Sequence, residues 1–155
     1  KNFLVHLGKD KSIEIHLFAL QKESGGRDFE FLKAISEKIN CEFLYYGDHF
    51  ENFVSKAASM DLNIGMRYHF SVISIQNGIP TIGINYQPKV KRELQKFNLD
   101  QFVVEMSEIT SANLIDKTQI ARKNHALISS EIHKQTQSLF KSSTKEVFHE
   151  VFRNL

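Results

Sequence analysis

The sequence predicts an α/β domain in which a parallel sheet is covered by helices. Short apolar runs of strand length alternate with amphipathic, helix-like segments between residues 12 and 105. Apolar residues make up 41% of the 155 residues, which is enough material for a packed core. Strands that alternate with helices are joined by crossovers and therefore pair in parallel, with helices on both faces of the sheet.

The first two strands are expected at residues 12–20 (SIEIHLFAL) and 41–46 (CEFLYY). The first run is apolar and rich in β-branched residues, and it follows a polar turn or helix end at residues 8–11. Residues 21–28 (QKESGGRD) form a loop with the only Gly-Gly pair of the chain. Apolar residues then recur at helical spacing over residues 29–39, which predicts the crossover helix.

The alternation continues through three further strands. A helix over residues 50–57 leads to a short strand at 61–65 (DLNIG), and a helix over 68–77 ends at Gly78. The later elements are a strand at 80–86, a basic helix within 87–97 and a strand at 101–105. Pro80 is compatible with this assignment because it stands at the first position of its strand.

The alternation stops at about residue 111. The remaining residues are polar with apolar side chains at helical spacing, which predicts helix with a break near Ser142 and Ser143. We therefore expect one Rossmann-like domain, with an α/β core over residues 1–110 and a helical tail over residues 111–155.

Composition and motifs exclude several classes of function. Twenty Lys and Arg against 18 Asp and Glu give a net charge of +2, too weak a field for a nucleic-acid partner. Cys41 is the single cysteine, so an internal disulfide and a thiolate zinc site are excluded. His125 and His133 share a helical face without a third ligand, so no metal is expected. No apolar run approaches the roughly 18 residues of a membrane span, and we expect a cytoplasmic protein.

Arg67 and His69 are the strongest candidates for a functional site. They follow a short strand and open a helix, where unpaired backbone N–H groups and the helix dipole favour an anion. Arginine offers a planar fork for a phosphate or carboxylate, and histidine can exchange a proton near neutral pH. The alternative is that Arg67 is a surface residue and His69 a satisfied histidine near the core.

Three short motifs of this region stand in order at compatible distances. They are Arg67-Tyr68-His69, Gly78-Ile79-Pro80 and Tyr86-Gln87-Pro88-Lys89. Together they resemble the signature of the polysaccharide pyruvyl transferase family. Tyr68 departs from the aliphatic residue expected between the arginine and the histidine, a change that should affect packing more than charge.

The resemblance implies the C-terminal, donor-binding half of a GT-B-like enzyme with two Rossmann-like domains. Such an enzyme transfers pyruvyl from phosphoenolpyruvate to sugar hydroxyls as a ketal, in exopolysaccharide or cell-wall biosynthesis, and needs no cofactor besides this donor. Arg67 would be the anion clamp, and His69 a phosphate ligand or the general acid. Both residues are expected to be catalytic as well as substrate-binding.

Further substrate contacts are expected from the ends of neighbouring strands. Tyr86 and Lys89 would reach the same cleft, although Lys89 belongs to a charge run that could be an ordinary solvated helix face. Gly25 and Gly26 would allow close approach of the backbone to a ligand. Their loop lacks GxGxxG and the P-loop lysine, so an ordinary turn is the alternative.

The chain begins at Lys1 without a methionine. We expect an N-terminal acceptor domain to be absent from it, and these residues alone to be inactive. The expected partners are phosphoenolpyruvate, a sugar or lipid-linked saccharide acceptor at the inner membrane face, and that N-terminal domain. Two alternatives remain at this point: half of a GT-B sugar-nucleotide glycosyltransferase or epimerase, and a non-catalytic Rossmann-like binding module.

Overall fold

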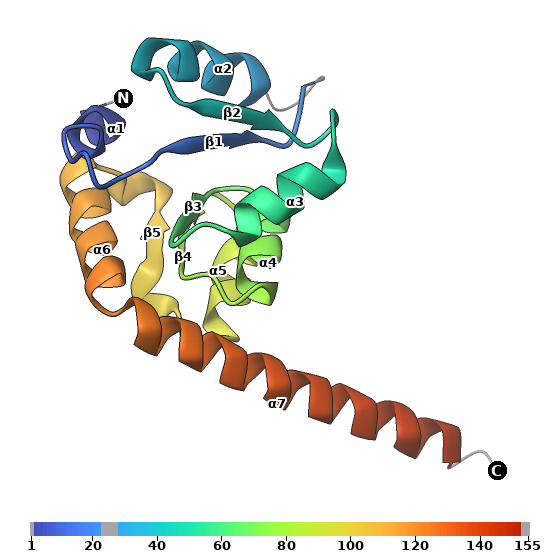
Figure 1. Ribbon diagram of the computed structural model, residues 1–155. Helices are drawn as coiled ribbons and strands as arrows, with labels where there is room; N and C mark the ends of the chain where they lie inside the picture. The colour runs from blue at the N-terminus through green and yellow to red at the C-terminus, as the bar shows by residue number, and fades with distance from the viewer. Residues whose placement is uncertain (1, 23–27, 153–155) are drawn as a thin grey trace.

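Five parallel strands form the framework of the protein in a computed structural model (Figure 1). The structure describes residues 2–22 and 28–152, with side chains as far as Phe140. The strands are β1 (His16–Ala19), β2 (Glu42–Tyr45), β3 (Asn63–Gly65), β4 (Thr81–Asn85) and β5 (Val103–Glu105). The predicted α/β class, with parallel pairing and flanking helices, is confirmed.

A helix follows each of the first four strands, as the alternation predicted. The helices are α1 (Asn2–Leu7), α2 (Asp28–Ile39), α3 (Phe50–Ala58), α4 (Tyr68–Gln76), α5 (Pro88–Gln95), α6 (Ser111–Lys123) and α7 (His125–Phe152). Two 3₁₀ turns, η1 (Asp100–Phe102) and η2 (Met106–Glu108), flank β5. Within the described residues, no helix is both long enough and apolar enough to cross a bilayer.

The helical tail is confirmed, but the predicted break near Ser142 and Ser143 is wrong. The chain breaks at Asn124, whose side-chain amide donates to the Ile120 carbonyl and whose backbone N–H also bonds back to α6. Helix α7 continues through both serines to Phe152. Serine costs only a fraction of a kcal/mol in a helix interior, so two serines do not end a helix by themselves. Helix α7 extends far beyond the body of the molecule (Figure 1).

The five strands divide between two hydrogen-bonded sheets, which differs from the single sheet we expected. Strand β1 pairs with β2, and β4 pairs with both β3 and β5. Aromatic side chains join the two sheets instead of a ladder. The ring of Phe18 on β1 lies 5.2 Å from that of Phe53 on α3 and 5.3 Å from that of Phe70 on α4.

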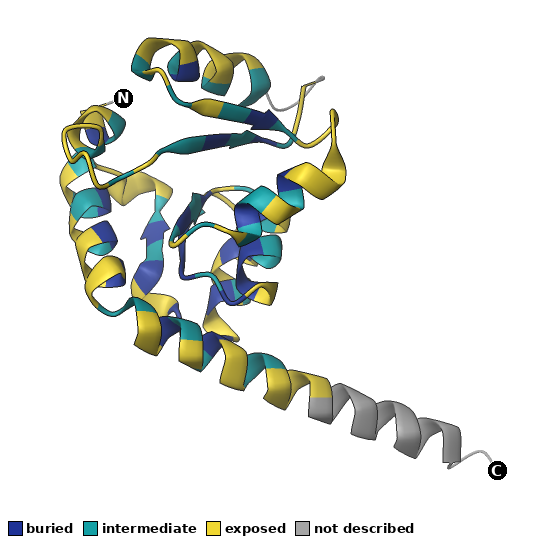
Figure 2. Cartoon of the chain, in the orientation of Figure 1, coloured by how far each residue is buried: buried dark blue, intermediate teal, exposed yellow. Residues whose placement is uncertain are grey.

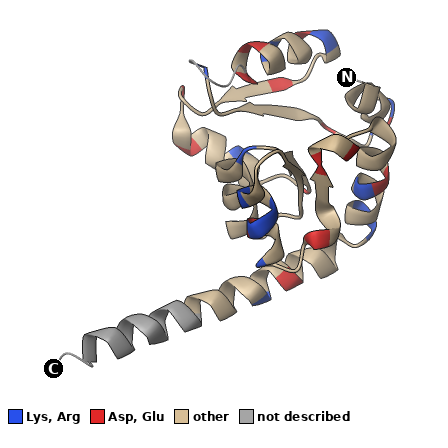
Figure 3. Cartoon of the chain, turned by 180° about the vertical axis from the view of Figure 1, so that it is seen from behind, with Lys and Arg blue, Asp and Glu red and all other residues tan. Residues whose placement is uncertain are grey.

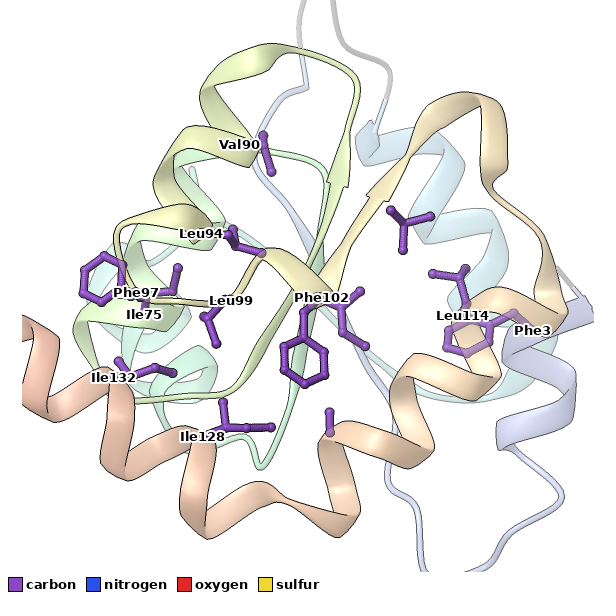
Figure 4. Close-up of a cluster of buried hydrophobic side chains, with 13 residues drawn as sticks. Phe3, Ile75, Val90, Leu94, Phe97, Leu99, Phe102, Leu114, Ile128 and Ile132 are labelled. Atoms are coloured by element: carbon purple, nitrogen blue, oxygen red, sulfur yellow. The ribbon is translucent and has the colours of Figure 1, made fainter.

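The main core surrounds the three-stranded sheet (Figure 4). Ile82 of β4 and Val104 of β5 are fully buried. Helices α4 and α5 cover one side of this sheet, and α1 and α6 lie on the other (Figure 1). The first turns of α7 close the core with Ile128 and Ile132, whereas the outward face of α2 stays exposed (Figure 2). The sheet is therefore covered on both faces, which holds its strand ends in place.

Asn63 fixes the start of β3 through buried hydrogen bonds. Its side chain is buried, and its amide donates to the Ala57 carbonyl at 3.0 Å and to Ser74 Oγ at 2.9 Å. We expect Asn63→Ala to lower the free energy of unfolding by about 1–3 kcal/mol, because it leaves a buried carbonyl unpaired. Urea unfolding followed by circular dichroism measures this loss. Asn77→Ala is the control, since exposed Asn77 also bonds a helix carbonyl and water can replace it; equal losses would contradict the prediction.

Candidate functional site

Arg67 and His69 lie at the carboxyl end of β3. The strand ends at Gly65, Arg67 is the N-cap residue of α4, and His69 is the second residue of that helix. No side chain caps this helix N-terminus, and its first turn contains no acidic residue. The first N–H groups of α4 and the positive end of its dipole are therefore available to an anion.

The site lies where the strand order changes direction. Helix α2 carries the chain from β1 to β2 on one side, and α3 returns it to β3 on the other side of β1 (Figure 1). Strands β1 and β3 belong to different hydrogen-bonded sheets, and Arg67 lies beside the point where the order of the strands reverses (Figure 1). Ligands of open parallel α/β sheets bind at such a point.

An ion pair joins the two strand ends. Arg67 Nη2 donates to Asp28 Oδ1 at 2.9 Å, and the two side chains are 23% and 17% exposed. Asp28 is the first residue of α2, and its Oδ2 also accepts the backbone N–H groups of Leu20 at 3.0 Å and Gln21 at 3.3 Å. Asp28 therefore ties the end of β1 to the start of α4.

Sequence reasoning did not find the role of Asp28. In the sequence it appears only as the last residue of the expected loop over residues 21–28. The available signal was its position, because an acid that follows the loop after β1 stands at the same sheet edge as Arg67. The Nε of Arg67 is buried and has no hydrogen-bond partner among the described residues.

His69 is exposed, and its side chain makes no hydrogen bond to a described residue. Its ring packs edge-on against the ring of Tyr68, with 5.5 Å between centroids. This position differs from the satisfied, near-core histidine of the alternative interpretation. His69 can therefore donate to a bound ligand or exchange a proton with it.

Lys89 differs from the neighbouring basic residues of α5. Its Nζ lies 5.6 Å from the centroid of the Tyr68 ring, beside the N-terminus of α4. Lys91 pairs with Glu105 at 3.0 Å and Lys96 with Glu93 at 2.8 Å, and hydrogen bonds to these carboxylates raise the pKa of both lysines. Figure 3 shows basic residues on α5 and others on α2 and α6. Among the described residues, no carboxylate pairs with Lys89, so its charge is available to an anion.

Tyr68 contacts charged groups as well as the core. The ring packs against the main core and under Lys89, and the hydroxyl donates to Glu93 Oε2 at 3.5 Å. The expectation that this residue affects packing more than charge is therefore incomplete. Tyr68 links the N-termini of α4 and α5.

The remaining candidates are less informative. Tyr86 is exposed just beyond the end of β4, and its side chain makes no hydrogen bond to the described part of the chain. Gly25 and Gly26 lie outside the described residues. Cys41 is partly buried, and desolvation raises the pKa of its thiol, which disfavours a nucleophilic thiolate.

Two surface hollows lie away from these residues. One of about 340 Å³ is formed by η1, α6 and α7, and one of about 160 Å³ runs along β2 and the start of α3. Neither contains Arg67, His69 or Lys89. Across residues 2–22 and 28–152, no three His, Cys, Asp or Glu side chains are grouped to hold a metal ion. The candidate site is therefore an open edge of the sheet that carries cationic side chains.

Comparison with known proteins identifies the family. The family model for polysaccharide pyruvyl transferase matches residues 2–88, more than half of the chain, and this match includes Arg67 and His69. Searches of curated proteins and of solved structures gave no match. With an α/β fold of parallel strands and a match that runs from α1 into the start of α5, the chain belongs to the polysaccharide pyruvyl transferase family.

Proposed function

We propose that this chain carries the donor site of a transferase that moves a pyruvyl group from phosphoenolpyruvate to sugar hydroxyls as a ketal. The observation that carries the proposal is the grouping of Arg67, His69 and Lys89 around the uncapped N-terminus of α4. Phosphoenolpyruvate bears a phosphate and a carboxylate, and this sheet edge offers cations and N–H groups for both. Family membership supports the reaction class.

Each side chain has a role that suits its chemistry. Arg67 binds one anionic group of the donor through guanidinium N–H groups that Asp28 does not use. Lys89 contributes a point charge, and the first turn of α4 contributes backbone N–H groups. His69 acts either as a phosphate ligand or as the general acid. Tyr86, exposed just beyond the end of β4, completes the proposed donor contacts.

The group transfer balances with two acceptor hydroxyls. A proton adds to the methylene carbon of the donor, and one hydroxyl oxygen bonds to C2 as it loses its proton. The bond from C2 to the phosphate oxygen then breaks, phosphate leaves, and the second hydroxyl closes the ketal. The products are the pyruvyl ketal and hydrogen phosphate. As general acid, His69 would supply the first proton; as a ligand, it would donate to a phosphate oxygen.

We place the acceptor across the site from the donor. A second Rossmann-like domain would hold the sugar, which positions its hydroxyls against C2 of the donor. The acceptor would be a saccharide, free or lipid-linked, in exopolysaccharide or cell-wall biosynthesis. The reaction would then take place in the cytoplasm, at the inner membrane face where the acceptor is lipid-linked.

Donor binding by the full-length protein tests this proposal. Isothermal titration calorimetry should show saturable binding of phosphoenolpyruvate, and addition of a saccharide acceptor should release phosphate in proportion to ketal formed. Inorganic phosphate and a nucleotide sugar are the comparison ligands. Tight binding of the nucleotide sugar without binding of phosphoenolpyruvate would instead favour a glycosyltransferase or epimerase.

A further inference from the structure

We propose that Asp28 is a positioning residue that holds the Arg67 guanidinium in the orientation needed for the donor. This inference rests on the proposed function, because it assigns Arg67 to donor binding. The pair spans the gap between the carboxyl ends of β1 and β3, and the two residues are 39 positions apart in the chain. Asp28 acts through Arg67 and does not itself contact the donor.

The Asp28 carboxylate is a fixed anchor. Its Oδ2 accepts the N–H groups of Leu20 and Gln21, and its Oδ1 accepts from Arg67. The residue also begins α2, where a negative charge is favoured by the helix dipole. With both oxygens bound and only 17% of the side chain exposed, the carboxylate cannot turn away without losing backbone hydrogen bonds. Its location is therefore set by β1 and α2, whether or not a ligand is present.

The Arg67 side chain depends on this anchor. Its hydrogen bond to Asp28 uses Nη2, while its Nε is buried without a partner among the described residues. A buried unpaired N–H group is unfavourable, so this position of the Arg67 side chain is maintained by its contact with Asp28. Since the contact with Asp28 uses one of the guanidinium nitrogens, further N–H groups remain for an anion.

Electrostatics alone predicts the opposite role for Asp28. A carboxylate beside an anion site repels the ligand, so neutralising it should strengthen binding of phosphoenolpyruvate. If Asp28 fixes Arg67 instead, neutralising it frees the guanidinium and weakens binding, because an ordered contact must then be formed at the cost of side-chain entropy. Repulsion by Asp28 and positioning of Arg67 by Asp28 therefore predict opposite changes in the affinity for phosphoenolpyruvate when Asp28 is neutralised.

Asp28→Asn in the full-length protein tests the inference. We expect about tenfold weaker binding of phosphoenolpyruvate in calorimetric titration, the effect of roughly one charge-assisted hydrogen bond. In steady-state kinetics, KM for the donor should rise while KM for the acceptor stays unchanged. A purely structural role would lower the active fraction, and so kcat, without this selective change in KM. Unchanged or tighter donor binding would overturn the inference.

Asp10→Asn is the matched control. Asp10 also accepts a backbone N–H, from Ser12, and also pairs with an arginine, Arg122, at 3.3 Å. This pair is exposed and joins the turn after α1 to α6, away from the site. Asp10→Asn should leave donor affinity unchanged, so a loss common to both variants would count against a specific role for Asp28.

Two further variants test the positioning role even if Asp28→Asn does not fold. Asp28→Ser retains a side-chain acceptor at the start of α2 but cannot reach Arg67, so it should reproduce the weaker binding if the asparagine variant does not fold. In an Arg67→Ala background, Asp28→Asn should have no further effect on donor affinity. If the wild type does not bind phosphoenolpyruvate, or Arg67→Ala binds it normally, the proposed function fails. If only the Asp28 variants bind normally, the positioning role fails alone.

Discussion

If Arg67 binds phosphoenolpyruvate as proposed, Arg67→Lys should lower kcat/KM for this donor by about ten- to a hundredfold. The guanidinium bonds Asp28 through one nitrogen and has others to offer the donor, whereas a lysine ammonium is a point charge without that planar geometry. Loss of one charge-assisted contact is equivalent to roughly 1.5–3 kcal/mol, or about one to two decades in rate.

Steady-state kinetics with varied phosphoenolpyruvate checks this expectation, with circular dichroism to confirm that each variant is folded. Arg122→Lys is the matched control, because Arg122 also pairs with an aspartate but lies on α6, away from the site. His69→Ala should impair transfer as well, since its exposed ring lies at the same helix N-terminus, against the ring of Tyr68. Near-wild-type kinetics in both site variants would count decisively against this site.

Local periodicity was sufficient to predict most of the elements. The apolar spacing over residues 29–39 and 50–57 correctly located α2 and α3, and Gly78 correctly marked the end of α4. The position of Arg67 and His69 at a strand-to-helix junction followed from the same pattern. Hydrogen bonds between neighbours along the chain and side-chain burial on one face determine these features, so a short window of sequence contains their signal.

Features that depend on distant contacts could not be predicted in this way. The two sheets meet through contacts of Phe18, Phe53 and Phe70, and these residues lie on three different elements. The pair between Asp28 and Arg67 likewise joins segments 39 residues apart. No periodicity within one segment encodes such contacts.

The structure also separates residues that look alike in the sequence. Lys89, Lys91 and Lys96 form one basic run, yet the latter two pair with carboxylates while Lys89 lies over Tyr68. The partner of Lys91 is on β5, which a sequence pattern cannot bring beside α5. Only the fold therefore shows which lysine of the run has no carboxylate partner among the described residues.

Gly78→Ala should lower the free energy of unfolding by about 1–2 kcal/mol. Gly78 has a φ of 75°, a left-handed conformation that costs an alanine about 1–2 kcal/mol. An added Cβ would also meet the end of the His133 ring of α7, but this exposed side chain can turn aside, so the steric contribution should be small. Ser129 Oγ donates to the Gly78 carbonyl at 2.7 Å, so α7 is held against this glycine and cannot move away freely.

Urea unfolding of single and double variants separates the two causes. Exposed His133 contributes little by itself, so His133→Ala alone should change stability by less than about 0.5 kcal/mol. Combined with Gly78→Ala, it should recover only the small steric part of the loss and leave the cost of the left-handed backbone. Gly8→Ala is the matched control, because a Cβ there would make only an ordinary contact, 3.5 Å from the Leu4 carbonyl oxygen. If Gly78→Ala destabilises the protein no more than Gly8→Ala does, the left-handed conformation at residue 78 is wrong.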